Sequence, residues 1–410
     1  MTTPLLLEEW SPKNIRDLTS EQIGDLLGIK GMKVEACQDG SFNVRSTENI
    51  VGYLRRGETS VIVSPSKCNA SHVLFMMGYA ENPRMFQDGQ VEFAEDYNLL
   101  ETFVSVFVRS ATKAIERGMF RSYFTVEDDL TVVRGRIRMG EQMSRRFRLS
   151  PPIAVSFDEF TVDNQENRLI RSAIELASKM PIRNPETTRS LQFLRVMFSD
   201  VSIVEFDHAW LPQPSWNRLN EHLEYVVSLA RRIIQNSSIS LEHGASSSDE
   251  FIINMANVFE DFVVTAIREQ LKLSRSEMPR ANEIHPQLYL DEGELVRLKP
   301  DISRWEGSRC VAVGDVKYKP ITDAGVIHAD IYQLLAYAVA NGLPEASLIY
   351  AMPKSEQVGL KLLKTHKIAG AHTHINVFAL DLTTSPGEVL RQIAEFSKSF
   401  EPRLSKVLVT

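Results

Sequence analysis

Apolar residues recur every three or four positions over long stretches of this 410-residue chain, which is the spacing of a helix with one buried face. The clearest examples are the segments 96–118, 162–180 and 252–267. The same reasoning predicts further helices at 20–28, 71–79, 187–198, 220–234, 330–340 and 387–400. Helices are therefore expected along the whole chain.

Short apolar runs bounded by Gly, Asn or Ser indicate strands near both ends of the sequence. In the first 90 residues the strand candidates are 32–36, 42–45, 50–54 and 60–64. Their spacing predicts a small barrel or meander. In the last third the candidates are 294–302, 310–315, 346–351 and 375–382. Alternating there with helices, they predict an α/β sandwich with a mixed sheet.

A chain of this length is too long for one ordinary core, so two or three domains are expected. A segment rich in Ser and poor in large apolar residues, 236–249, is the predicted linker. It divides a β-rich domain at 1–90 and a helical and β-finger region at 91–235 from a C-terminal domain at 250–410. The predicted fold class is therefore multi-domain, α+β in the first part and α/β in the last.

Composition and missing motifs limit the class of protein, its expected compartment and its expected ligands. The apolar fraction of 43% and charged fraction of 24% are globular values, and the net charge of −7 confines any DNA contact to a local patch. Three widely spaced cysteines argue against a disulfide framework and against a zinc site. The sequence shows neither a signal peptide nor an apolar stretch of membrane-spanning length, so we expect a cytoplasmic protein with no membrane contact. It also lacks a Walker-type phosphate loop, so the chain should not bind a nucleotide itself.

Two carboxylates and a lysine stand out in the last third. Asp301 follows Pro300, and Asp315 and Lys317 lie two positions apart in the next predicted strand, so their side chains point the same way. A hairpin would bring Asp301 beside Asp315, where the like charges repel unless a cation lies between them. Hard oxygen ligands suit Mg²⁺. The alternative is a hairpin with ordinary surface charges.

Three further residues are candidates for the same centre. Glu260 lies on the apolar stripe of the helix at 252–267, so it either needs a partner or metal or is a surface acid at the edge of the stripe. Gln333 and Tyr337 lie four positions apart on one face of the helix at 330–340.

Six arginines fall between residues 134 and 148 against one acid, Glu141. The candidates for contact with a phosphate or with a partner's nucleotide site are Arg134, Arg136, Arg138, Arg145 and Arg146. The alternative is a solvated hairpin.

The pattern Pro-Asp…Asp-x-Lys resembles the signature of the PD-(D/E)xK nuclease superfamily, and most of the chain resembles the McrC family of McrBC modification-dependent restriction systems. The segments that carry the resemblance are Val51–Leu54, Leu130–Ile137, Phe157–Arg168, Val258–Val263, Leu298–Ile302, Asp315–Lys319 and Asp330–Tyr337. One departure is Gly314, where a bulkier strand residue is usual and which is expected to weaken the strand.

The resemblance implies a type IV restriction endonuclease subunit with a C-terminal PD-(D/E)xK fold, a mixed sheet flanked by helices. Asp301, Asp315, the Val316 carbonyl and Glu260 would hold Mg²⁺, and Lys317 would orient the attacking water. Gln333 and Tyr337 would support the site.

The resemblance also implies a partner, an McrB-like AAA+ GTPase hexamer that binds GTP and recognises double-stranded modified DNA, commonly with methylcytosine. The region 91–235 would contact this partner, and its arginines would stimulate GTP hydrolysis. Two alternatives remain open: an autonomous DNA repair nuclease with the same core, and a non-enzymatic activator of an AAA+ ring.

Overall fold

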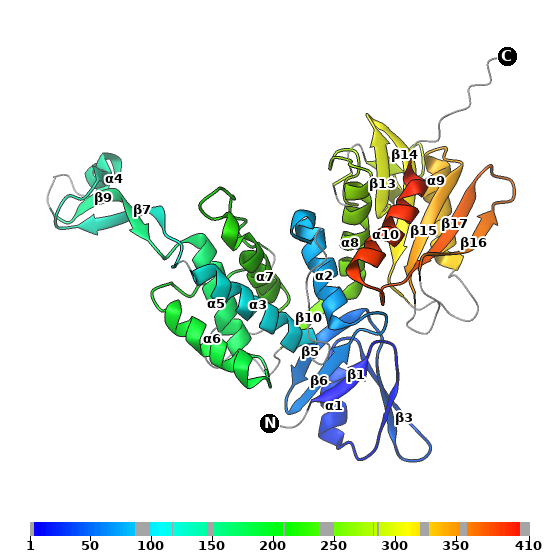
Figure 1. Cartoon of the computed structure of the whole chain (residues 1–410), viewed down its shortest axis with the longest axis horizontal. Coiled ribbons are helices and arrows are strands. Elements are labelled where there is room, and N and C mark those ends of the chain that lie inside the picture. The colour runs from blue at the N-terminus through cyan, green and yellow to red at the C-terminus, as the bar shows by residue number, and fades with distance from the viewer. Residues whose placement is uncertain are drawn as a thin grey trace. The chain divides into compact units, whose positions relative to one another are not determined.

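The structure, a computed structural model, describes residues 4–86, 99–116, 118–145, 151–207, 210–237, 250–281, 283–284, 287–319, 328–352 and 359–401. The chain forms two compact units (Figure 1). The first unit combines Met1–Thr102 with Ser247–Thr410, and the second unit is Phe103–Ser246. The prediction of a mixed α+β, multi-domain chain is confirmed.

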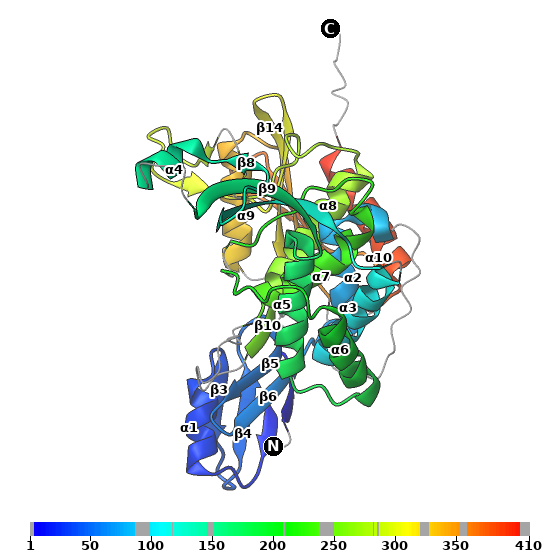
Figure 2. The ribbon, with the colours of Figure 1, turned by 90° about the vertical axis from the view of Figure 1, so that its left-hand side faces the viewer.

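The N-terminal part of the first unit contains two sheets. The four-stranded sheet has the order β1 (Leu5–Glu8), β6 (Thr59–Ser64), β5 (Ile50–Arg56) and β10 (Glu250–Asn254). The three-stranded sheet has the order β2 (Lys13–Ile15), β4 (Phe42–Ser46) and β3 (Met32–Ala36). Figure 2 shows helix α1 (Ser20–Gly28) beside these strands. Buried residues of α1 and of both sheets form one core: Leu7, Leu26, Ile29, Met32, Val44, Ile50, Leu54, Val61 and Val63.

Strand β10 ties the C-terminal part of the chain to this sheet. It pairs antiparallel with β5, with Phe251 opposite Tyr53 and Ile252 opposite Gly52. Gly52 has φ +131°, and a Cβ there would lie 2.0 Å from the Phe251 carbonyl oxygen. Only glycine therefore allows β10 to approach so closely, because any side chain would meet its backbone.

Helices α2 (Ala70–Glu81) and α8 (Met255–Gln270) pack against each other in the same unit. The rings of Phe75 and Tyr79 lie edge-on to Phe262, with centroid distances of 5.5 and 5.6 Å. The short 3₁₀ helix η1 (Pro83–Phe86) follows α2. Aromatic packing thus joins the N-terminal segment to the helix that carries Glu260.

A five-stranded mixed sheet forms the C-terminal part of the first unit. Its order is β13 (Ile302–Glu306), β14 (Arg309–Lys317), β15 (Glu345–Ala351), β17 (His374–Leu380) and β16 (Lys361–Lys367). The two edge pairs are antiparallel and the inner pairs are parallel. A separate two-stranded ribbon precedes it, made of β11 (Leu288–Tyr289) and β12 (Arg297–Leu298).

Helices cover both faces of this sheet. On one face, α9 (His328–Ala340) buries Leu334 in the cluster that contains Val313 of β14. The next residue of β14, Gly314, faces Phe400 in η3 (Lys398–Phe400), which follows α10 (Pro386–Ser397). Because neighbouring strand residues point to opposite faces, α9 and η3 lie on opposite sides of the sheet.

The second unit is a helical body with a projecting hairpin. Its helices are α3 (Leu99–Ile115, which begins in the first unit), α4 (Met139–Arg145), α5 (Gln165–Lys179), α6 (Pro185–Met197), η2 (Glu221–Leu223) and α7 (Glu224–Gln235). Its strands are β7 (Ser122–Leu130), β8 (Arg136–Ile137) and β9 (Ile153–Thr161). Figure 1 shows the β7–β9 hairpin extending away from α5, α6 and α7, with α4 at its far end.

Most predicted helices and strands lie where the structure has them, with two informative exceptions. The predicted helix at 252–267 begins only at Met255, because Glu250–Asn254 forms strand β10 and the Asn254 side chain caps the helix. The predicted strand at 294–302 is interrupted, because β12 ends at Leu298 and β13 begins at Ile302. Pro300 lies in the gap and has no N–H to donate to a ladder.

The proposed division into 1–90, 91–235 and 250–410 stays a prediction about domains. The compact units group the chain differently, since the segments 1–102 and 247–410 share one unit. The predicted linker at 236–249 lies outside the described residues from position 238 onward.

Candidate functional site

The β13–β14 hairpin brings Asp301 and Asp315 together. Ile302 pairs with Gly314, so Asp301 lies just before the first pair and opposite Asp315. The Val316 N–H donates a hydrogen bond to Asp301 Oδ2 at 2.9 Å. This bond fixes one carboxylate oxygen of Asp301 against the backbone of the strand that carries Asp315.

Lys317 completes the group. Its Nζ lies 3.9 Å from Asp301 Oδ2 and forms a closer ion pair with Asp315. Asp315 and Lys317 are two positions apart in β14 and therefore share a face of the sheet. Three charged side chains thus converge at the carboxyl end of β14, two of them acidic.

The Asp315 carboxyl is almost inaccessible, with a side-chain exposure of 1%. Burial, together with the nearby Asp301 charge, raises its pKa from 3.8 to about 8. Apart from the ion pair, neither carboxyl oxygen accepts a hydrogen bond from a described residue. Burial lowers the pKa of Lys317, but Asp315 and Asp301 outweigh burial and raise it. One lysine therefore does not compensate the two carboxylates in this setting.

Glu260 approaches the group from α8. Burial raises its pKa to about 7, and the charges of Asp301 and Asp261 add to the effect, while Lys317 opposes it. Glu260 is thus within electrostatic reach of Asp301 and Lys317. In the part of the chain that the structure describes, no group of three or more His, Cys, Asp or Glu residues has the arrangement of a metal site. The assignment of Glu260 as a ligand stays a prediction.

Gln333 and Tyr337 of α9 hold the chain segment that leads into Asp301. Gln333 Nε2 donates to the Tyr337 hydroxyl at 2.7 Å, and that hydroxyl donates to the Lys299 carbonyl at 3.2 Å. Lys299 lies two residues before Asp301 in the segment between β12 and β13. A strand ladder does not fix this segment, so the α9 contacts hold it in place.

A second ion pair lies next to the group and was not singled out from the sequence. Lys319 Nζ lies 2.7 Å from Asp330 Oδ1, and the Tyr350 hydroxyl donates to the other oxygen of Asp330. Asp330 is buried near the start of α9, and its charge contributes to the raised pKa of Lys317. Only the repeated lysine in Asp315–Lys319 gave any signal for this pair in the sequence.

Two arginines of the predicted basic cluster, Arg134 and Arg138, are paired in the second unit. The Arg134 guanidinium lies over the Phe157 ring at 4.0 Å and 3.7 Å from Glu159. Arg138 pairs with Glu127 and Glu141. The acids Glu127 and Glu159 come from β7 and β9, outside the window in which the arginines were counted.

Of the other candidates, Arg136 is exposed on β8 and has no ion pair among the residues that the structure describes. The side chain of Arg145 and all of Arg146 lie outside the described part of the chain.

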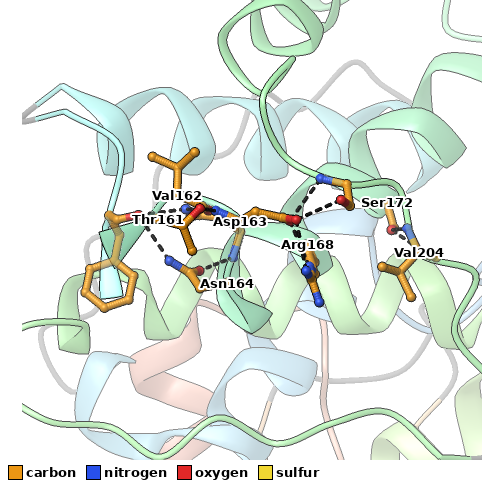
Figure 3. Close-up of polar contacts among 10 residues, drawn as sticks. Thr161, Val162, Asp163, Asn164, Arg168, Ser172 and Val204 are labelled. Atoms are coloured by element: carbon orange, nitrogen blue, oxygen red, sulfur yellow. Dashed lines mark hydrogen bonds and ion pairs between the residues drawn. The ribbon is translucent and has the colours of Figure 1, made fainter. Parts of the chain in front are cut away.

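A polar network attaches the hairpin to its helical body. Figure 3 shows Asp163, just after β9, receiving hydrogen bonds from Arg168 of α5, whose Nε lies 2.8 Å away. The Ser202 hydroxyl and N–H also donate to Asp163. Arg168 and Ser202 hold the pKa of the Asp163 carboxyl well below its usual range. These contacts explain the segment Phe157–Arg168 as a joint between strand and helix.

A match to a protein-family model shows the family to which the chain belongs. Residues 46–351 match the model of a family described as the McrBC 5-methylcytosine restriction system component. This segment is more than half of the 410 residues. The chain belongs to this McrBC family. The matched segment contains both the Asp301 and Asp315 group and the β7–β9 hairpin.

Solved structures also contain chains that are similar to this McrBC-family chain. It is similar to a chain in a refined half-complex from a tetradecameric assembly of Thermococcus gammatolerans McrB AAA+ hexamers with bound McrC. The TM-score is 0.61 at 17% identity, with 97% of this chain and 100% of the other covered. A chain of a cryo-EM structure of the T. gammatolerans McrBC complex matches with a TM-score of 0.41 at 17% identity, covering 67% of this chain and 90% of that one. No curated protein matches the chain significantly.

None of the described helices has the length and apolar character needed to cross a membrane.

Proposed function

We propose that this McrBC-family chain is the endonuclease subunit of a modification-dependent restriction complex and hydrolyses DNA phosphodiesters with Mg²⁺. The observation that carries the proposal is the buried Asp315 carboxyl, held beside Asp301 and Lys317 at the end of β14; apart from its ion pair with Lys317, its oxygens accept no hydrogen bond from the described residues. A buried carboxylate so poorly satisfied is costly, and such groups gather at functional sites. The PD-(D/E)xK assignment of the surrounding sheet and helices belongs to the same proposal.

The side chains fit Mg²⁺ by their donor chemistry. Asp301, Asp315 and the Val316 carbonyl are hard oxygen donors, and Mg²⁺ usually takes one or two carboxylates and fills its other positions with water and phosphate. A divalent cation would also offset the burial and the repulsion from Asp301 that together raise the pKa of Asp315 to about 8. When bound, the ion would polarise the phosphate and make its water more acidic. Glu260 would hold the ion or its water from α8.

The chain's own groups would then position the reactants. Lys317 carries a raised pKa and stays protonated at neutral pH, so its ammonium would orient the attacking water and stabilise the charge that develops on the phosphate. Tyr337, supported by Gln333, keeps the Lys299 backbone and hence Asp301 in register with Asp315. These groups act through position rather than through covalent chemistry.

We further propose that the chain works with an McrB-like AAA+ GTPase hexamer on double-stranded modified DNA in the cytoplasm. The family match and the likeness to a chain from a complex of McrB hexamers with bound McrC support this partner. The partner would bind GTP, and the β7–β9 hairpin would stimulate hydrolysis. Among the described arginines, Arg136 is the most available for this role, because Arg134 and Arg138 are already paired.

The deciding variants are Asp301→Asn and, as a control, Glu269→Gln at an exposed position near the end of α8. Methylated plasmid is incubated with Mg²⁺, GTP and the AAA+ partner. Asp301→Asn should abolish cleavage yet stimulate GTP hydrolysis like the wild type, and Glu269→Gln should cleave normally.

Three outcomes would contradict this account. Full cleavage by Asp301→Asn would refute the site. Cleavage by the chain without its partner would favour an autonomous nuclease. A wild type that stimulates GTP hydrolysis but never cleaves would favour a non-enzymatic activator.

A further inference from the structure

Glu9, directly after β1, is a buried acid with no role in the site described so far. Its side chain is fully buried, and its N–H donates to the Ser64 carbonyl at 3.0 Å. Glu9 Oε2 accepts hydrogen bonds from the Ser66 N–H at 3.2 Å and from the Tyr318 hydroxyl at 3.0 Å. The other oxygen, Oε1, has no hydrogen-bond donor among the described residues. An acid from the start of the chain thus reaches the residue that follows Lys317.

Lys67 makes a second contact to the same place. It is 3% exposed, and its Nζ donates to the Lys319 carbonyl at 2.6 Å while lying 4.7 Å from the centre of the Tyr318 ring. The ammonium therefore holds the backbone of Lys319 and one face of the neighbouring aromatic ring.

Both contacts fall where β14 has ended. The ladder with β15 stops at Lys317, opposite Tyr350, so Tyr318 and Lys319 lie beyond the last ladder pair of β14. Glu9 and Lys67 replace the missing ladder with side-chain bonds. The Tyr318 ring also lies 5.9 Å from Phe259, which immediately precedes Glu260 in α8. The Tyr318 position is therefore linked to both Lys317 and Glu260 through direct chain neighbours.

Burying the charged groups Glu9 and Lys67 between these segments costs free energy. Burial raises the pKa of Glu9 to about 7 and lowers that of Lys67 to about 8, so each group is harder to ionise than in water. Apolar side chains would join the same surfaces without this cost. Directional bonds from charged groups are better suited than apolar packing to fix a strand end in one position.

We propose that Glu9 and Lys67 are positioning residues for DNA cleavage. By anchoring Tyr318 and Lys319, they hold Lys317 and the Val316 carbonyl in place against Asp301 and Asp315. The proposal rests on the metal-dependent nuclease function proposed above. With this role for Glu9 and Lys67, the N-terminal sheets of the first unit are part of the nuclease centre rather than a separate module.

The test compares Tyr318→Phe with Tyr79→Phe in the full-length chain. Tyr318→Phe keeps the ring against Phe259 and removes only the hydroxyl that donates to Glu9. Tyr79 is a matched control, since it is also a buried tyrosine of the first unit whose ring packs on α8, at Phe262. A third variant, Lys67→Met, removes the bond to Lys319.

Two readouts separate positioning from simple support of the fold. The first is Mn²⁺ binding by the isolated chain, followed by electron paramagnetic resonance. The second is the Mg²⁺ concentration that half-saturates plasmid cleavage with partner and GTP. We expect Tyr318→Phe to weaken both by about 10-fold, the range found for groups that orient metal ligands. Tyr79→Phe should match the wild type in both readouts, and Tyr318→Phe should lower the thermal midpoint by no more than roughly a few degrees, because Glu9 keeps the bond from the Ser66 N–H.

Equal metal dependence of Tyr318→Phe and Tyr79→Phe would overturn the positioning role while leaving the nuclease proposal intact. A loss of cleavage in Tyr318→Phe that only follows a lowered thermal midpoint would overturn it as well. If Lys67→Met fails to fold, the two tyrosine variants still decide the question. Failure of the nuclease proposal is distinguishable, because the wild type would then bind Mn²⁺ no better than Asp315→Asn.

Discussion

Replacing Asp315 by Asn is expected to stabilise the metal-free chain while abolishing cleavage. The folded pKa of Asp315, about 8, lies above its ordinary value of 3.8, so the folded state binds the proton more tightly than the unfolded state. The wild type therefore loses stability as pH rises from about 4 to about 8. Asn lacks this titration, so its advantage should be small near pH 5 and greatest at pH 8.

The structure sets the scale of the effect. Each pKa unit corresponds to about 1.36 kcal/mol, so a rise from 3.8 to about 8 bounds the cost of ionising Asp315 at roughly 6 kcal/mol. This bound already includes the ion pair with Lys317, which lowers the pKa of Asp315 and which Asn removes. Asn leaves Lys317 with a second acidic neighbour, Asp301, at 3.9 Å, so we expect a net gain of roughly 2 kcal/mol, well below this bound. For a unit of this size that is a midpoint increase of about 4–8 °C.

Thermal unfolding in EDTA at pH 5 and pH 8 measures this effect, with Asp330→Asn as the control. Asp330 is also a buried acid of the first unit, but Lys319 and Tyr350 satisfy both of its oxygens. Its replacement should lower the midpoint, because it leaves Lys319 without an ion partner. The reasoning is refuted if Asp315→Asn lowers the midpoint at pH 8, as a stabilising Asp315–Lys317 pair would require.

Lys317→Met should reduce plasmid cleavage at least about 100-fold without changing the partner's GTP hydrolysis, and near-normal cleavage would exclude a role for the ammonium. Gly314→Ala should lower the free energy of unfolding in urea by about 1–3 kcal/mol, because a Cβ would lie 2.8 Å from the Phe400 ring. An unchanged urea midpoint would show that the Phe400 ring moves aside without cost. Asp163→Asn should cost about 2 kcal/mol at pH 7, since Arg168 holds the pKa of Asp163 below its usual range, and that stability is lost as pH falls through the folded value. A chemical denaturation difference of equal size at pH 7 and at pH 2 would contradict the last expectation.

Local signals in the sequence predicted most of the elements. The predicted strand at 32–36 is β3, and the predicted helix at 330–340 is α9 apart from its first two residues. Helical periodicity and turn residues act within a few positions, so one sequence suffices to read them. The pairing of β10 with β5 was not predicted, because it joins residues about 200 positions apart and depends on the bare backbone of Gly52.

The sequence likewise predicted the local features of the candidate site but not those that depend on distant segments. The placement of Asp315 and Lys317 on one face follows from strand geometry, and a hairpin places Asp301 opposite. The burial of Asp315 and the bond from Tyr318 to Glu9 depend on distant segments and leave no local pattern. The acids that pair with Arg134 and Arg138 could not be anticipated for a related reason, since Glu159 and Glu127 lie on the paired strands β9 and β7, far from these arginines in sequence.

The most direct test of the central claim is cleavage of methylated and unmethylated plasmid by this chain with Mg²⁺, with and without GTP and an McrB-like AAA+ protein. The account predicts that double-strand cleavage needs the methylated plasmid, both proteins and GTP together, and that Asp315→Asn removes cleavage and leaves GTP hydrolysis. Cleavage by the isolated chain, or undiminished cleavage by Asp315→Asn in the complete mixture, would contradict it.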